Sequence, residues 1–284
     1  MMFATTVPKF PLAHIVDVAL DWTTSHFAFI TKALSHGLSA VIDAIVSGLL
    51  FVPPWLLIPA IAALGWWAAG RRVAIGTLVG LLFLWDLRLW EPTVQTFTLV
   101  LISTLIAVAI GLPLGIAAAL NKRTNRIVMP VLDFMQTMPA FVYLIPAIPF
   151  FGLGAVSAAV ATVIFSTPPA IRLTALGIRQ VPADLIEAAD AFGSTRWQKL
   201  FKVQLPMAVP TIMAGVNQTI MLALSMVVIA AMIGAGGLGG EVWKAIQRLE
   251  PGKGFESGIA IVVLAMILDR ITQRIGRRND AKSH

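Results

Sequence analysis

The three longest uncharged runs of the chain are mostly apolar, and each is long enough to cross a lipid bilayer as a helix. They cover residues 93–120, 134–171 and 203–240, and none holds an Asp, Glu, Lys or Arg. About 20 apolar helical residues suffice to cross the hydrocarbon core of a bilayer. Only 12% of all residues are charged, against about 25% in an average soluble domain. The sequence therefore predicts an all-α, polytopic membrane protein built as a helical bundle.

The number of crossings is predicted from the lengths of the runs. Residues 134–171 would form a helix of roughly 57 Å, which is too long for one crossing, and FGLGAVS at 151–157 supplies a break. We therefore predict two spans there, at about 138–151 and 156–172. Three further apolar runs bring the expected total to about seven transmembrane helices, and they cover residues 54–70, 73–85 and 257–271.

The N-terminal segment is apolar but not continuously so. Lys32, His36 and Asp43 interrupt residues 26–50, so we expect an amphipathic helix on the outer face of the membrane rather than a crossing. The first residues have neither a basic n-region nor a cleavage site, which predicts no signal peptide. The chain then divides into four segments: an outer-face segment 1–50, two accessory spans in 51–92, a core of five spans in 93–275 and a cytoplasmic tail 276–284.

The basic residues are distributed unevenly over the loops between these spans. If the loop with Arg71 and Arg72 is cytoplasmic, 15 of the 21 Lys and Arg residues lie on the cytoplasmic side and 6 on the outer side. Cytoplasmic loops of membrane proteins carry an excess of Lys and Arg. We therefore expect the N-terminus outside the cell and the C-terminus in the cytoplasm.

Several chemistries are disfavoured by the residues that the sequence lacks. The chain has no Cys, and none of its four His residues has metal-ligand spacing with a partner, so no metal site is expected. It has no G-x-x-x-x-G-K-[ST] phosphate loop and no H-E-x-x-H or G-x-S-x-G motif, which argues against a membrane enzyme. Its basic residues are not clustered as in a nucleic-acid-binding protein. Ionisable residues are nearly absent from the spans, which disfavours a proton-coupled transporter.

A polar island at residues 182–206 separates two of the apolar runs. The sequence VPADLIEAADAFG predicts a short helix, with Pro182 near its first turn and Gly193 as its left-handed C-terminal cap. Ser194 or Thr195 can cap a second helix. A helix this short is not stable alone in water, so it docks either on a partner protein or on its own chain. The residues by themselves favour neither alternative.

The same island resembles the EAA motif of permease subunits of binding-protein-dependent ABC importers, E-A-A-x3-G-x9-I-x-L-P. Val203 stands where the motif has Ile, and Pro206 marks the join with the next span. In that family the motif is a cytoplasmic coupling helix that sits in a cleft of a separate ATP-hydrolysing chain. The residues that match the motif are Glu187, Ala188, Ala189, Gly193, Leu205 and Pro206.

The resemblance covers about residues 50–275 and is strongest to the glycine betaine/proline betaine permease subunits of bacterial osmoprotectant importers. Examples are STPPAIRLTALGIRQVP at 166–182 and AGVNQTIMLALSMVVIAAMIGAGGLGGEVW at 214–243. It implies a non-catalytic subunit of the bacterial inner membrane that works by alternating access. The implied partners are a second copy of the chain, two ATPase subunits that hold ATP and Mg, and a separate periplasmic substrate-binding protein. The chain itself would bind no cofactor, and choline or carnitine are alternative substrates.

The resemblance also suggests an outer gate and a pathway. Gly234, Gly236, Gly237 and Gly239 are candidates for a turn that seals the pathway, and an ordinary Gly-rich loop is an equal alternative. Three polar uncharged residues lie at depth in the predicted spans: Asn217, Gln218 and Thr219. Interhelical hydrogen bonding is their favoured use, and Asn217 and Gln218 are also candidates for lining the pathway.

A quaternary ammonium group is best held by aromatic faces. The interior offers five aromatic residues as candidates for such a contact: Phe141, Tyr143, Phe150, Phe151 and Phe165. Of these, Tyr143 is also a candidate for lining the pathway. The main rival function is a stand-alone secondary transporter, in which the polar island would be a mere connector. Inverted repeats would support that rival, and the sequence shows no clear internal repeat.

Overall fold

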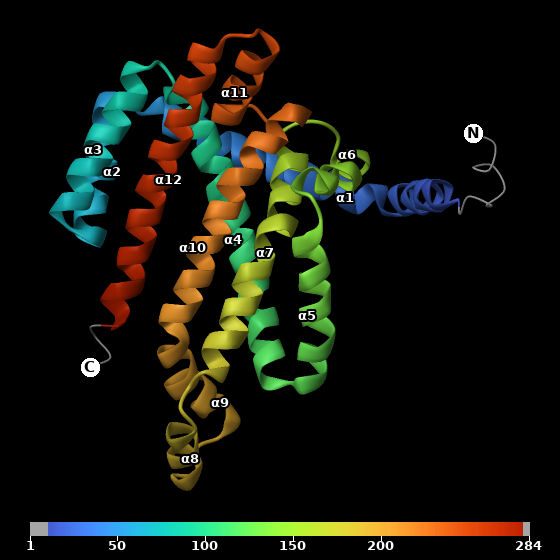
Figure 1. The fold of residues 1–284 in the computed structure, drawn as a ribbon, viewed down its shortest axis with the longest axis vertical. Helices are drawn as coiled ribbons and strands as arrows, with labels where there is room; N and C mark the ends of the chain where they lie inside the picture. Colours follow the sequence, from blue (N-terminus) through green and yellow to red (C-terminus); the bar gives the residue numbers. More distant parts are fainter. Residues whose placement is uncertain (1–10, 281–284) are drawn as a thin grey trace, which may run out of the picture.

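The computed structural model describes residues 11–280, which fold into helices with no strand among them (Figure 1). This confirms the predicted all-α fold. Three long helices form the core of the bundle, and α7 packs against both of the others along its length. They are α4 (Trp90–Leu120), α7 (Ala155–Arg179) and α10 (Leu205–Ala230).

Helices α4 and α7 approach each other closely at two glycines. A Cβ atom built on Gly111 would lie 2.6 Å from the Cβ of Ala170, and one on Gly115 would lie 2.6 Å from the Cβ of Thr174. Small residues four apart let two helix backbones come together where the hydrophobic effect does not drive association. The sequence around them, GLPLG at 111–115, is a G-x-x-x-G motif.

The predicted straight span over 138–151 is wrong. The chain instead rises through α5 (Lys122–Thr137) and then bends by 111° into η1 (Ala140–Tyr143) and α6 (Leu144–Phe151). Met138 has extended dihedral angles, because the Pro139 that follows disfavours the helical region at the residue before it. The break expected after Phe151 is present, since Gly152 and Gly154 have φ angles of 78° and 115°.

An ion pair joins α5 to the core. Arg172 of α7 and Asp133 of α5 are 2.6 Å apart, nitrogen to oxygen. Asn121 caps the start of α5 by accepting a hydrogen bond from the backbone N–H of Arg123 at 2.8 Å. Residues 122–133, which lie outside all the predicted spans, therefore belong to a helix that packs against α4 and α7.

Two shorter helices, α2 (Pro54–Ala69) and α3 (Arg71–Asp86), form a hairpin around Gly70, whose φ is 88°. At 16 residues each, they reach about 24 Å, less than the bilayer core of about 30 Å. Over the described residues, helix length and composition give four crossings, or five if the bent α5–α6 pair counts as one. Seven full-length crossings are thus not established.

Helix α1 (Leu12–Phe51) is longer than the helix expected over 26–50 and lies across the bundle (Figure 1). Its composition qualifies it as a membrane span, yet it runs crosswise to α4, α7 and α10. Ile42 anchors it by packing with Ile102 of α4 and Ala159 of α7 in one buried cluster.

The chain ends in α12 (Pro251–Asp280), which packs against α10, α11 (Gly237–Gln247), α3 and α2. A short turn, η3 (Ala231–Ile233), separates α10 from α11. The expected tail at 276–284 is helical as far as Asp280, and residues 281–284 lie outside the described part of the chain. So do residues 1–10, which were expected to lack a signal peptide.

Candidate functional site

The polar island forms a protrusion at the lower end of the bundle in Figure 1. Helix α8 (Ala183–Ala191) projects there and buries none of its residues. Pro182 precedes its first turn and Asp184 lies in that turn, where a carboxylate interacts favourably with the helix dipole. Gly193 follows α8 with a φ of 72°, and the N–H of Ser194 donates to the carbonyl of Ala189 at 3.0 Å. The predicted left-handed cap is therefore present.

A capping box starts the second helix of the island. The hydroxyl of Thr195 accepts a hydrogen bond from the backbone N–H of Gln198, and the Gln198 side chain accepts one from the backbone N–H of Thr195. Of the two predicted caps, Thr195 is thus the one used. The helix α9 (Arg196–Lys199) that follows is tied back to α8, because Lys199 Nζ lies 2.6 Å from a carboxylate oxygen of Asp190.

The island continues into the membrane without a break. After α9 the backbone widens into one π-helical turn, η2 (Leu200–Gln204), and then enters α10, so one helix runs from Arg196 to Ile233. Pro206 was expected to mark the join with the next span, and it lies in the first turn of α10, which continues the helix of the island without a break. Inside a regular α-helix, a proline ring clashes with the carbonyl four residues earlier. Here the turn before Pro206 is wider, and the N–H of Leu205 donates to the carbonyl of Leu200, five residues earlier. Such turns occur frequently at functional sites.

The island has a buried side and an exposed side. Leu200 is buried together with Ile178 and Ala208 and anchors the island to α7 and α10. Three large aromatic side chains point the other way into solvent: Phe192 is 91% exposed, Trp197 69% and Phe201 58%. Large exposed apolar groups that are rimmed by polar residues mark interaction sites.

The residues that match the EAA motif are shared between these two sides. Glu187, Ala188, Gly193 and Pro206 are exposed, whereas Ala189, Val203 and Leu205 are half-buried. Glu187 also lines a hollow of about 300 Å³ between α8 and the lower ends of α4 and α7. Arg179, another lining residue, donates a hydrogen bond to the carbonyl of Ala118 near the end of α4.

The candidate pathway residues Asn217, Gln218 and Tyr143, and the polar neighbour Thr219, occupy different environments. Asn217 donates to a carboxylate oxygen of Asp269 on α12 at 2.8 Å, which is an interhelical hydrogen bond. Gln218 is exposed on α10, and Thr219 is fully buried. Tyr143 is buried, donates its hydroxyl hydrogen to the carbonyl of Met135, and its ring meets that of Phe165 edge-on at 5.7 Å.

The other aromatic candidates do not gather around Tyr143. Phe141 is exposed on η1, and the rings of Phe150 and Phe151, on α6, lie 6.3 Å apart. In the described part of the chain, no three metal-ligating side chains come together.

The glycine-rich candidate gate is held against α4. Gly234, Gly236 and Gly237 all have positive φ angles. The N–H of Gly237 donates to the side-chain oxygen of Gln95 at 2.9 Å, and the N–H of Leu238 donates to the hydroxyl of Thr96 at 2.8 Å. Two side chains of α4 thus each satisfy one N–H group at the start of α11 that has no partner within the helix.

Comparison with known proteins identifies the family. A family model described as "Binding-protein-dependent transport system inner membrane component" matches residues 111–281. The chain belongs to this family.

Several relatives are similar to this chain over nearly its whole length. The "Glycine betaine transport system permease protein OpuAB" of Bacillus subtilis is 56% identical over 95% of this chain and 95% of that protein. The "Glycine betaine/carnitine transport permease protein GbuB" of Listeria monocytogenes is 52% identical over 96% and 98%. The "Glycine betaine/proline betaine transport system permease protein ProW" of Escherichia coli is 48% identical over 96% and 77%.

The fold of this permease is also found among solved structures. A structure titled as an inward-facing conformation of the MetNI methionine ABC transporter aligns with a TM-score of 0.61 at 24% sequence identity. The alignment covers 65% of this chain and 93% of that one. At this level of identity the similarity concerns the fold alone.

Sequence reasoning missed several residues that position the site. Gln95 and Thr96, which hold the glycine segment, lie 142 residues away from it, and no local pattern links the two. The close contacts of Gly111 and Gly115, by contrast, were detectable, because G-x-x-x-G within an apolar run is a recognised signal for helix packing.

Proposed function

We propose that the chain is the membrane-spanning permease subunit of an ATP-driven importer for glycine betaine or a closely related quaternary amine. The observation that carries this proposal is the 56% identity, over 95% of the chain, to a protein named for glycine betaine transport. The family name supplies the dependence on a substrate-binding protein. Carnitine is the second candidate substrate, because a relative 52% identical is named for glycine betaine and carnitine.

The polar island is proposed to couple the permease to its ATPase. Helix α8 exposes a carboxylate at Glu187, and Phe192, Trp197 and Phe201 expose aromatic surface beside it. The aromatic groups would dock in an apolar cleft, and Glu187 would accept hydrogen bonds from backbone N–H groups or an Arg of the ATPase. Because one helix runs from Arg196 to Ile233, a push on the island would tilt α10 as a rigid lever.

We propose that alternating access uses both ends of this lever. Its lower end carries the island, and its upper end carries the glycine segment that Gln95 and Thr96 hold against α4. We propose that two copies of the chain form the pathway, with Gln218 on the exposed face of α10 as a lining residue. Two ATPase subunits would bind ATP and Mg below, and a binding protein would deliver substrate above.

The decisive experiment combines assembly, ATP hydrolysis and transport. The chain is co-expressed with its ATPase and binding protein in cells lacking other osmoprotectant importers, and uptake of radiolabelled glycine betaine is measured. The test variants are Gly193→Asp and Glu187→Lys, and the control is Asp21→Lys, an exposed carboxylate on the half of α1 that projects away from the bundle. Both test variants should insert normally and lose ATPase stimulation by loaded binding protein, whereas Asp21→Lys should behave like wild type.

Two results would overturn the proposal. Uptake that persists without any ATPase would make the chain a stand-alone transporter and the island a connector. Full ATPase stimulation in both test variants would show that the island does not couple the permease to its ATPase, and it would not contradict the proposed import function. Inhibition of radiolabelled glycine betaine uptake by unlabelled carnitine would show that carnitine, the second candidate substrate, also binds the importer.

A further inference from the structure

The glycine segment between α10 and α11 is held by tertiary hydrogen bonds at both of its ends. At its start, the N–H of Gly154, in the turn before α7, donates to the carbonyl of Ile233 at 2.9 Å. At its end, two side chains of α4 accept from the first two N–H groups of α11. We call this second pair of bonds the latch. Because side chains make the latch, a third side chain can control it.

The two acceptors of the latch differ in how their orientation is fixed. Thr96 is 1% exposed, and its hydroxyl oxygen can accept from Leu238 in any rotation of its own hydrogen. Gln95 is half-buried, and its amide has one group that accepts and one that only donates. Only one of the two amide orientations therefore bonds the N–H of Gly237. The other places the NH₂ group against that N–H, donor against donor.

Glu91 selects the productive orientation. Nε2 of Gln95 donates to Oε1 of Glu91 at 3.2 Å, and Oε1 of Gln95 accepts from Gly237 at 2.9 Å. An ionised carboxylate only accepts hydrogen bonds, so it draws the amide nitrogen toward itself and leaves the amide oxygen facing α11. Hydrogen bonds in a chain also polarise one another, so the carboxylate makes that oxygen a stronger acceptor.

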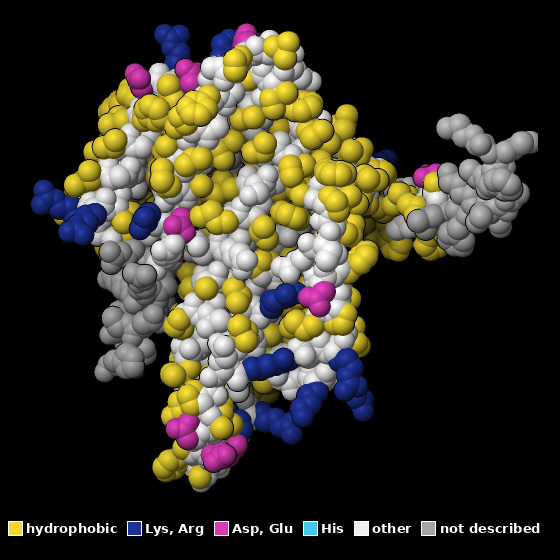
Figure 2. Space-filling view, in the orientation of Figure 1, with side chains coloured by type: hydrophobic (Ala, Val, Ile, Leu, Met, Phe, Trp, Pro, Cys, Tyr) yellow, Lys and Arg dark blue, Asp and Glu magenta, His cyan; other side chains and the backbone are white. Residues whose placement is uncertain are grey.

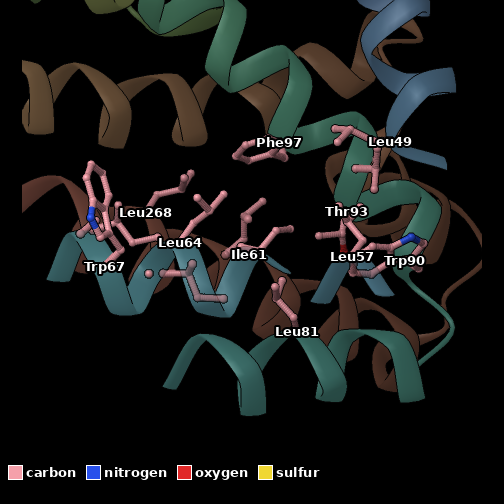
Figure 3. Close-up of a pocket in the computed structure, with 16 residues that line it drawn as sticks. Leu49, Leu57, Ile61, Leu64, Trp67, Leu81, Trp90, Thr93, Phe97 and Leu268 are labelled. Carbon is pink, nitrogen blue, oxygen red and sulfur yellow. The ribbon is translucent and has the colours of Figure 1, made fainter. Parts of the chain in front are cut away.

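This arrangement differs from an ordinary pair on a helix surface. Two polar side chains four residues apart normally support only their own helix. In the same turns of α4, Trp90, Thr93 and Phe97 line an apolar pocket shared with α2 and α12 (Figure 3). By helical spacing Glu91 and Gln95 lie on a different face of α4, and that face meets α11. The orientation of one amide thus decides whether the two helices are bonded at this point.

We propose that Glu91 is a positioning residue of the outer gate, which keeps the Gln95 amide in the orientation that closes the latch. This inference rests on the proposed function, in which the glycine segment lies at the upper end of the lever α10. With Glu91 in place, that end stays bound to α4 until the loaded binding protein arrives. Without it, the amide samples both orientations, and the segment is released for part of the time.

The first test measures hydrogen exchange at single backbone amides of the full-length chain in nanodiscs. In Glu91→Ala the amide of Gly237 should exchange about two- to tenfold faster, the range expected for one hydrogen bond. The amide of Leu238 should change little, because its acceptor is Thr96. A general loosening of α11 would accelerate both amides equally and would overturn the positioning role. The matched control is Asp86→Ala, which removes the exposed carboxylate at the end of α3 and should change neither amide.

The second test asks whether Glu91 acts through Gln95. Gln95→Ala should accelerate exchange at Gly237 at least as much as Glu91→Ala does. Adding Glu91→Ala to Gln95→Ala should then have no further effect, because the group that the carboxylate orients is already gone. Additive effects of the two substitutions would mean that Glu91 acts on the glycine segment by another route, and would overturn the proposal.

The third test measures ATP hydrolysis by the complex with the ATPase, in the absence of binding protein. Glu91→Ala should raise this unstimulated rate about two- to fivefold, the same range as one hydrogen bond, whereas Asp86→Ala should leave it unchanged. Faster exchange at Gly237 with an unchanged unstimulated rate would overturn the gating role of the latch. Failure of the proposed function would appear instead in the wild type, as absent uptake of glycine betaine. The exchange measurements need neither uptake nor ATP hydrolysis, so the two failures are distinguishable.

Discussion

At the scale of single residues, Gly239 is the position of the candidate gate that backbone atoms confine most tightly. A Cβ atom on Gly239 would lie 2.6 Å from the carbonyl oxygen of Val227 and 3.0 Å from the Cα of Val228, both in the backbone of α10. Backbone atoms cannot move aside as a flexible side chain can. We therefore predict that Gly239→Ala destabilises the protein by about 1–3 kcal/mol, as expected for an overpacked core, and lowers its melting temperature in detergent.

The neighbouring glycine provides the control for this prediction. A Cβ atom on Gly240 would have nothing within 4 Å, and alanine is favoured over glycine inside a helix by about 0.5–1 kcal/mol. Gly240→Ala should therefore leave the melting temperature unchanged or raise it slightly. Equal melting temperatures for the two variants would show that α10 and α11 are not packed as described.

Single residues also show which parts of the island the sequence could predict. Pro182, Gly193 and Thr195 act on the backbone next to them, so their roles as helix boundaries were visible without a structure. Pro139 acts just as locally, but the helix before it was not among the predicted spans, so the bend at Met138 between α5 and η1 was not predicted.

At the scale of elements, the ion pair between α8 and α9 links the exposed helix to the lever. Lys199 is 19% exposed and Asp190 54%, so the pair contributes about 0.2–1 kcal/mol to stability. Its importance would lie in the orientation of α8. We predict that Lys199→Gln lowers ATPase stimulation about two- to fivefold with little change in melting temperature.

A charge swap distinguishes this orienting role from a direct contact with the ATPase. The double variant Asp190→Lys with Lys199→Asp restores the pair in reverse and should recover most of the stimulation. If instead the double variant is as impaired as either single variant, then Lys199 or Asp190 contacts the partner itself, and the orienting role is wrong. The coupling between the two sites is read from the complete double-mutant cycle.

The arrangement of the elements was the least predictable level of the structure. The apolar runs correctly predicted the helices α4, α7 and α10, because a long uncharged segment has few stable structures other than a helix inside a membrane. The crosswise position of α1 depends on contacts such as that of Ile42 with Ile102 and Ala159, which are far apart in sequence. The hydrogen bonds from the glycine segment to Gln95 and Thr96 are likewise tertiary, and no periodic pattern encodes them.

At the scale of the whole molecule, the distribution of charge predicts the orientation in the membrane. Figure 2 shows Lys and Arg side chains gathered around the lower part of the bundle, and others at its upper end. The lower group lies beside the island that is proposed to meet the ATPase. Cytoplasmic loops carry an excess of basic residues, so the lower end should face the cytoplasm and the end formed by α11 and the start of α12 should face outward.

The absence of cysteine from the chain makes this orientation directly measurable with single-cysteine variants. We place one cysteine at exposed Ala191 on α8, one at exposed Gly252 on α12 and one at exposed Ser25 on α1, and label intact cells with a membrane-impermeant maleimide. Gly252→Cys and Ser25→Cys should react from outside, and Ala191→Cys only after permeabilisation. Protection of Ser25→Cys on both sides would mean that α1 crosses the bilayer, contrary to its crosswise position against α4. Labelling of Ala191→Cys in intact cells would reverse the orientation and, because ATP is cytoplasmic, would also exclude the island as a coupling site.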